Sequence, residues 1–103
     1  MQTELWIGLV ELKPLDRQAY GAAGAFTNIV TWANDETGFR RKAEMIAAAL
    51  EMFVLEVEGA EPLAERTQKW GMTDEIDEMV LRAECNPDAI VYGTFHRYPF
   101  DQA

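Results

Sequence analysis

The side chains best suited to chemistry alternate near the C-terminal end of the chain, along one predicted strand: Tyr92, Thr94, His96 and Tyr98. Alternate side chains of a strand point to the same face of a sheet, so we expect these four to lie side by side. His96 is the only histidine, and histidine is the side chain whose ordinary pKa lies closest to neutral pH. This face is the best polar constellation in the sequence.

Glu56 and Glu58 share the polar face of another predicted strand, over residues 52–58. If the two strands are neighbours, His96 meets a carboxylate, and such a pair can transfer protons or bind a divalent metal through two protein ligands. Nothing in the spacing demands either chemistry, and a lone histidine near a strand end is more often a surface residue. We therefore predict a ligand-binding face here, with no catalytic residue, no metal site and no cofactor.

Aromatic residues add a second reason to consider the same face. Trp32 lies at the end of a predicted strand, and Tyr92 lies within another. Aromatic side chains with a polar tip are enriched at interfaces, so a sheet face that bears them and lacks a covering helix suits a ligand groove or a homodimer contact. The alternative is that the aromatic rings fill the core of a small domain.

A run of small residues at positions 21–24, Gly-Ala-Ala-Gly, predicts a flexible loop. The backbone amides of Gly21 and Gly24 could approach a ligand there. However, no Lys-Ser or Lys-Thr follows, and the spacing of a dinucleotide-binding loop is absent. A plain connection between two elements is the competing interpretation.

Other chemistries find little support. The sequence contains no serine, so the serine-nucleophile motifs are absent. The single cysteine, Cys85, excludes an intramolecular disulfide, and its neighbours Glu84 and Asp88 disfavour a reactive thiolate. The acids of residues 74–78 lack the glycine and the oxygen spacing of a calcium loop and are explained by a helix N-terminus.

Charge separates the two halves of the chain. Residues 1–50 contain six acidic and five basic residues, whereas residues 51–103 contain twelve acidic and four basic residues. The net charge of the chain is −9. Such a field repels phosphate backbones, so we expect no nucleic-acid partner. It favours a basic protein partner, although a solvated acidic face that keeps the protein soluble explains the same composition.

The spacing of apolar residues along the chain predicts the helices and strands that position these side chains. Strands are expected over residues 5–12, 26–32, 52–58 and 89–98, and Gly8 inside the first marks a bulge or a close approach. Helices are expected after an Asn34–Asp35 cap, over residues 63–69 and after a Thr73 cap, with a short turn at residues 16–20. We predict an α+β two-layer sandwich with a four-stranded mixed or antiparallel sheet, helices mainly on one face, and a broadly ferredoxin-like arrangement.

The length of 103 residues predicts one domain, 1–103, and no apolar run approaches a membrane span. The N-terminus lacks a basic signal region, so we expect a cytoplasmic location and no membrane partner. Because the sequence offers few residues suited to catalysis, we interpret the chain as an acidic protein-binding or regulatory module that can form a homodimer. The alternative is a small-molecule binder or enzyme with a polar site around His96 and Tyr92.

Overall fold

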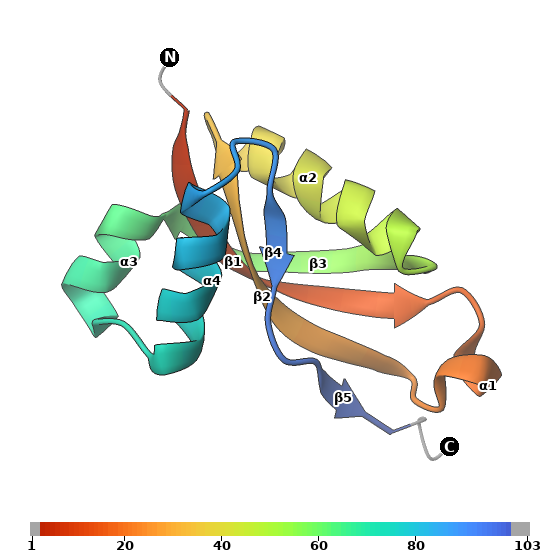
Figure 1. The fold of residues 1–103 in the computed structure, drawn as a ribbon. Coiled ribbons are helices and arrows are strands. Elements are labelled where there is room, and N and C mark those ends of the chain that lie inside the picture. Colours follow the sequence, from red (N-terminus) through yellow and green to blue (C-terminus); the bar gives the residue numbers. More distant parts are fainter. Residues whose placement is uncertain (1–2, 100–103) are drawn as a thin grey trace.

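A computed structural model describes residues 3–99 of the chain, which form five strands and four helices around one antiparallel sheet (Figure 1). In chain order the elements are β1 (Glu4–Pro14), α1 (Arg17–Tyr20), β2 (Gly24–Ala33), α2 (Glu36–Ala49), β3 (Met52–Pro62), α3 (Leu63–Trp70), α4 (Asp74–Glu84), β4 (Ile90–Tyr92) and β5 (His96–Tyr98).

Side-chain caps start three of the helices. The carboxylate of Asp16 accepts a hydrogen bond from the Ala19 amide at α1, and that of Asp35 accepts one from the Gly38 amide at α2. The hydroxyl of Thr73 accepts one from the Ile76 amide at α4. Each bond satisfies an amide that has no partner inside its helix, which explains why the helices begin at these residues.

The helix α3 has no side-chain cap and is held instead by charge. Glu61, just before the end of β3, accepts from the Lys69 ammonium at 2.7 Å and from Arg66 Nε at 2.8 Å. Arg66 also donates to the Gly59 carbonyl at 3.0 Å. The three side chains tie the helix to the end of the strand from which it emerges.

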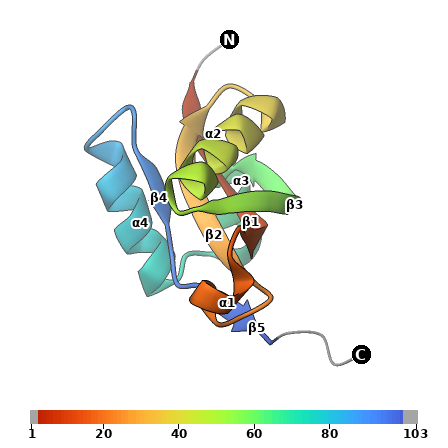
Figure 2. The same ribbon diagram turned by 90° about the vertical axis from the view of Figure 1, so that its right-hand side faces the viewer.

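The strand order is β3-β1-β2-β4, and β5 pairs with β2 beyond β4. All pairings are antiparallel. The strand β3 therefore forms one edge of the sheet, and the two short strands β4 and β5 together form the other. Figure 2 shows β3 along one side of the molecule and β4 along the opposite side.

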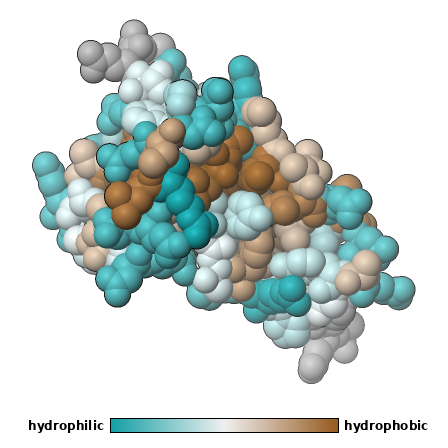
Figure 3. All heavy atoms as spheres, in the orientation of Figure 1, coloured by the Kyte–Doolittle hydropathy of each residue, from teal (hydrophilic) through white to brown (hydrophobic). Residues whose placement is uncertain are grey.

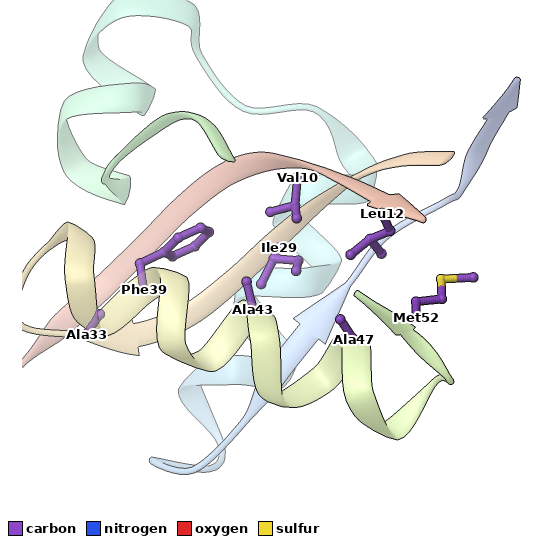
Figure 4. Close-up of a cluster of buried hydrophobic side chains, with 8 residues drawn as sticks. All are labelled: Val10, Leu12, Ile29, Ala33, Phe39, Ala43, Ala47 and Met52. Carbon is purple, nitrogen blue, oxygen red and sulfur yellow. The ribbon is translucent and has the colours of Figure 1, made fainter. Parts of the chain in front are cut away.

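The hydrophobic core has two parts, one on each face of the sheet. The first gathers small and large apolar side chains of β1, β2, β3 and α2 (Figure 4), namely Val10, Leu12, Ile29, Ala33, Phe39, Ala43, Ala47 and Met52. The second joins the other faces of β1 and β2 to α4: Ile7, Val30, Met79, Val80 and Ala83. Because neighbouring residues of a strand point to opposite faces, Ile29 and Val30 belong to different parts of the core.

Gly8 allows α2 to approach the sheet. A Cβ atom at this position would lie 2.9 Å from the fully buried ring of Phe39 and 3.1 Å from the Ala60 Cα. The pairing of β1 with β3 also shifts register between Ile7 and Leu9. Of the two alternatives expected at this glycine, the close approach is confirmed, whereas the register shift places its extra residue in β3, between Glu58 and Glu61, and not at Gly8.

The α+β class is confirmed, with differences in detail. The sheet has five strands rather than four, because the predicted strand 89–98 divides into β4 and β5. Helices α2 and α4 pack on opposite faces, whereas we expected helices mainly on one. The expected ferredoxin-like topology is not confirmed. The strands β1 and β2 form an antiparallel pair connected by the short helix α1, and the first long helix, α2, comes only after β2. Among residues 3–99, no helix is both long and apolar enough to cross a membrane.

Candidate functional site

The break between β4 and β5 changes which side chains share a face. Tyr92 pairs with Ile29 of β2, and His96 pairs with Phe26. From Tyr92 to His96 the last segment advances by four residues, whereas the paired strand β2 advances by three. The alternation of side chains is therefore shifted by one residue. Tyr92 lies on the α2 face, and His96 lies on the opposite one. The prediction that they share a face is wrong.

The residues of the break itself contact α4 and the first part of the core. The hydroxyl of Thr94 donates to Glu75 Oε2 at 2.7 Å, and its amide donates to Glu75 Oε1 at 3.4 Å. These two hydrogen bonds, with the nearby His96, hold the pKa of the Glu75 carboxyl below its ordinary value. A Cβ at Gly93 would lie 2.5 Å from Glu75 Oε1, so glycine is needed for this contact between loop and helix.

On the side of the sheet away from α2, one half is covered by α3 and α4 and the other half carries no helix. We call the uncovered half the open face. The strand register assigns to it side chains that are half-buried or exposed: Leu9, Glu11, Lys13, Phe26, Asn28, Phe53, Glu56, Glu58, His96 and Tyr98. Five of the ten come from the central strands, namely Leu9, Glu11 and Lys13 of β1 with Phe26 and Asn28 of β2, positions that a covering helix would bury.

One row of the open face joins both edges of the sheet. Glu56 of β3 pairs with Glu11 of β1, Glu11 pairs with Phe26 of β2, and Phe26 pairs with His96 of β5. Two carboxylates therefore lie directly opposite each other, an arrangement that costs stability when no cation lies between them. In the adjoining row Glu58 pairs with Leu9, so three carboxylates gather toward the β3 side.

Tyr98 closes the other side of this acidic group. Its hydroxyl donates a hydrogen bond of 2.5 Å to Glu11 Oε2, within the range of a charge-assisted bond. Its ring packs 5.6 Å from that of Phe26, and the Lys13 ammonium lies 5.1 Å from its centroid. A Cβ at Gly24 would lie 2.3 Å from the Tyr98 hydroxyl oxygen, so only glycine lets the ring reach across β2 to Glu11.

The predicted pair of His96 with Glu56 or Glu58 does not form. The strands that carry them lie at opposite edges, with β1 and β2 between. Three strand spacings of about 4.8 Å separate their backbones by roughly 14 Å, too far for a hydrogen bond. Proton transfer between His96 and these carboxylates, and a metal shared by them, are therefore not available within this chain.

Trp32 lies on the covered half of the same side of the sheet. Its indole Nε1 donates to the carbonyl of Ala83 at 2.8 Å and to that of Asn86 at 3.1 Å. Carbonyls at the C-terminal end of a helix lack partners inside the helix, and the indole supplies one. Trp32 thus tethers α4 and is not gathered with the other predicted ligand residues.

Three of the four residues of the Gly21–Gly24 segment are buried, and only Gly21 is exposed. Gly21 has φ of 80° and ends α1, while Ala22 and Ala23 are buried. The Ala23 amide donates to the Tyr98 carbonyl at 3.1 Å, and Gly24 begins β2 beneath the Tyr98 ring. The two glycines serve a helix end and a close approach between strands, and the expected loop tip is not present.

Other parts of the described chain give less support for a functional site than the open face does. Within residues 3–99 no group of three or more His, Cys, Asp and Glu side chains is placed to hold a metal ion. The thiol of Cys85 is exposed at the end of α4, away from the open face. A hollow of about 370 Å³ beside α1 is lined by Tyr20, Asp16 and Glu51 among others, and the Tyr20 hydroxyl is buried without a hydrogen-bond partner.

Sequence reasoning missed Glu11, Lys13 and Phe26 as members of the site. A signal was present in the first strand, where alternation along one face runs from apolar Ile7 and Leu9 to charged Glu11 and Lys13. That change marks the point where the helical cover of the face ends. No such signal showed that Tyr98 would reach Glu11, because the contact depends on strand order.

The chain matches no family, no curated protein and no solved structure.

Proposed function

We propose that this protein is a binding module that takes a basic segment of another protein on its open face. The observation that carries the proposal is the concentration of Glu11, Glu56 and Glu58 on an uncovered sheet face beside aromatic rings. Carboxylates that lie opposite one another are relieved by a cation from a partner, and aromatic faces attract lysine and arginine as well. The net charge of −9 would speed the encounter with such a partner.

The alternative, a small-molecule site around His96 and Tyr92, has less support because the two side chains lie on opposite faces of the sheet. A homodimer through the open face is also less well supported, because two copies would bring their carboxylate groups together. A partner of opposite charge fits the same surface without that cost.

The test is chemical-shift mapping with a short acetylated peptide of alternating lysine and valine as the probe. We expect amide shifts to concentrate at Glu11, Phe26, Glu56 and Tyr98. The double variant Glu11→Gln with Glu56→Gln should weaken binding about two- to thirtyfold, since it removes two exposed ion pairs that contribute about 0.2–1 kcal/mol each.

A control is needed because an acidic protein attracts basic peptides from all sides. Glu65→Gln with Glu84→Gln removes the same charge from exposed positions on α3 and α4. Binding that weakens equally in both double variants, or shifts spread evenly over all acidic residues, would show non-specific attraction and contradict the proposal.

A further inference from the structure

The strand β3 presents a free edge beside the open face. It is the terminal strand of the sheet, and among the described residues it pairs only with β1. Along one side of the strand, main-chain N–H and C=O groups therefore lack a strand partner. A free edge of this length is a template for pairing with another extended segment, unless side chains or bulges oppose it.

The side chains of β3 select what can pair there. Glu56 and Glu58 lie on the open face and are exposed, while Val54 and Val57 lie on the α2 face and pack partly against the first core. Phe53 and Leu55 are each 47% exposed, a large apolar exposure for two residues so close together on one strand. The edge thus combines acidic residues at alternate positions with uncovered apolar surface.

A second copy of this chain is a poor occupant of the edge. Antiparallel pairing of two β3 strands would bring the glutamates of both copies into one short stretch of the same face. The register of β3 against β1 also shifts between Glu56 and Val54, and a bulge of this kind twists an edge away from flat pairing. A single extended segment has more backbone freedom to follow that twist than a strand held within a second sheet.

We infer that an extended segment of a basic protein partner adds to the sheet as a strand along β3. Its basic side chains occupy alternate positions on the open face beside Glu56 and Glu58. The β-branched or apolar residues between them lie on the α2 side, beside Val54 and Val57. Main-chain hydrogen bonds supply affinity, and the alternation of charge selects the sequence and its register.

This inference rests on the proposed function and adds a mode of binding to it. A basic helix lying flat on the open face would satisfy the proposed function without using the edge. The two modes differ in what happens to the backbone amides of β3, since only strand addition protects them.

The experiment uses the full chain and the lysine–valine peptide in two forms, unmodified and with alternate backbone amides N-methylated. Methylation removes main-chain donors while the charge of the side chains is kept. With the unmodified peptide we expect hydrogen exchange of solvent-facing amides within residues 53–58 to slow at least about tenfold at saturation. We expect the methylated peptide to bind at least about tenfold more weakly, because it loses the main-chain hydrogen bonds to the edge.

Three outcomes separate the two ideas. Protection of β3 together with weak binding of the methylated peptide supports the inference. Binding that depends on Glu11 and Glu56 but leaves β3 unprotected, with equal affinity for both peptides, retains the proposed function and overturns strand addition. If neither peptide binds, or if binding weakens as much in the Glu65→Gln, Glu84→Gln control as in the Glu11→Gln, Glu56→Gln variant, both are contradicted.

Discussion

At the scale of single residues, the open face depends on a contact between the last strand and the first. Tyr98 reaches Glu11 only because Gly24 lies between them without a side chain. The interaction orders one of the three carboxylates, and it leaves Glu56 and Glu58 toward the free edge. The position of Glu11 and the packing of β5 on β2 therefore both depend on Gly24.

Replacing this glycine should disturb the site more than the fold. We expect Gly24→Ala to displace the Tyr98 ring, break its bond to Glu11 and destabilise the protein by about 1–3 kcal/mol through overpacking. Denaturant unfolding measures the loss of stability, and the Tyr98 ring resonances report the displacement. Gly21→Ala is an unsuitable comparison because its φ is positive, so Ala22→Gly serves as the control for a change in this segment. Unaltered Tyr98 resonances in Gly24→Ala would contradict the role assigned to the glycine.

Glu61 makes the attachment of α3 sensitive to acid. The hydrogen bonds from Lys69 and Arg66 lower the pKa of its carboxyl in the folded state. A lowered pKa stabilises the fold above the ordinary carboxyl value of about 4.3, and that contribution is lost as the pH falls through the lower folded value. The stability difference between wild type and Glu61→Gln should therefore shrink as the pH falls from about 5 to about 3.

Denaturant midpoints measured at several pH values check this dependence. Glu65→Gln, an exposed position on the same helix, should follow the pH profile of the wild type. A constant difference between wild type and Glu61→Gln over the whole range would show that the ion pairs with Lys69 and Arg66 do not contribute.

At the scale of elements, two helices on opposite faces of the sheet have different attachments. The helix α2 packs through Phe39, Ala43 and Ala47, and its small alanines bring it close to the strands. The helix α4 uses Met79, Val80 and Ala83 and is tethered at its C-terminal end by the indole of Trp32. The contact of Glu75 with Thr94 holds its first turn to the break between β4 and β5.

Removing the indole donor should loosen α4 selectively. Trp32→Phe keeps an aromatic ring but loses both hydrogen bonds, and we expect a loss of about 1 kcal/mol in stability. Hydrogen exchange should accelerate in α4 and leave α2 at the rate of the wild type. Uniform acceleration in both helices would indicate that Trp32 supports the whole sheet rather than one helix.

At the scale of the whole molecule, exposed apolar surface and negative charge act against each other. Figure 3 shows hydrophobic side chains gathered on the side between α2 and β4, with hydrophilic ones over much of the surrounding surface. Large apolar side chains are also exposed elsewhere, including Trp70 at 78% and Leu15 at 68%. The net charge of −9 opposes self-association through such surfaces.

This balance predicts a monomer whose self-association depends on salt. At low ionic strength we expect a single species near 11.7 kDa by sedimentation. At about 1 M salt the Debye length falls to about 3 Å, so repulsion is screened and weak association through the apolar surface should increase. A stable dimer at low salt would contradict this expectation and would favour the homodimer that the sequence also allowed.

Local signals in the sequence predicted most of the helices and strands close to their observed positions. The caps at Asp35 and Thr73, the spacing of Phe39, Ala43 and Ala47, and the β-branched runs are short-range signals, and each gave an element near its observed position. The close approach at Gly8 could also be predicted, because a glycine inside a strand often marks a bulge or a neighbouring group that leaves no room for a side chain. Local propensity and periodicity carry this information along a few turns of chain.

Which of these side chains meet depends on long-range strand pairing. The order β3-β1-β2-β4 separates His96 from Glu56 by two strands, and the break at residues 93–95 moves Tyr92 to the other face. Periodicity specifies faces within one strand, but it contains nothing about which strands are neighbours or where an irregularity shifts the alternation by one. The proposed site therefore lies at the carboxylates around Glu11 and not at His96 and Tyr92, because long-range pairing rather than local pattern places these carboxylates together.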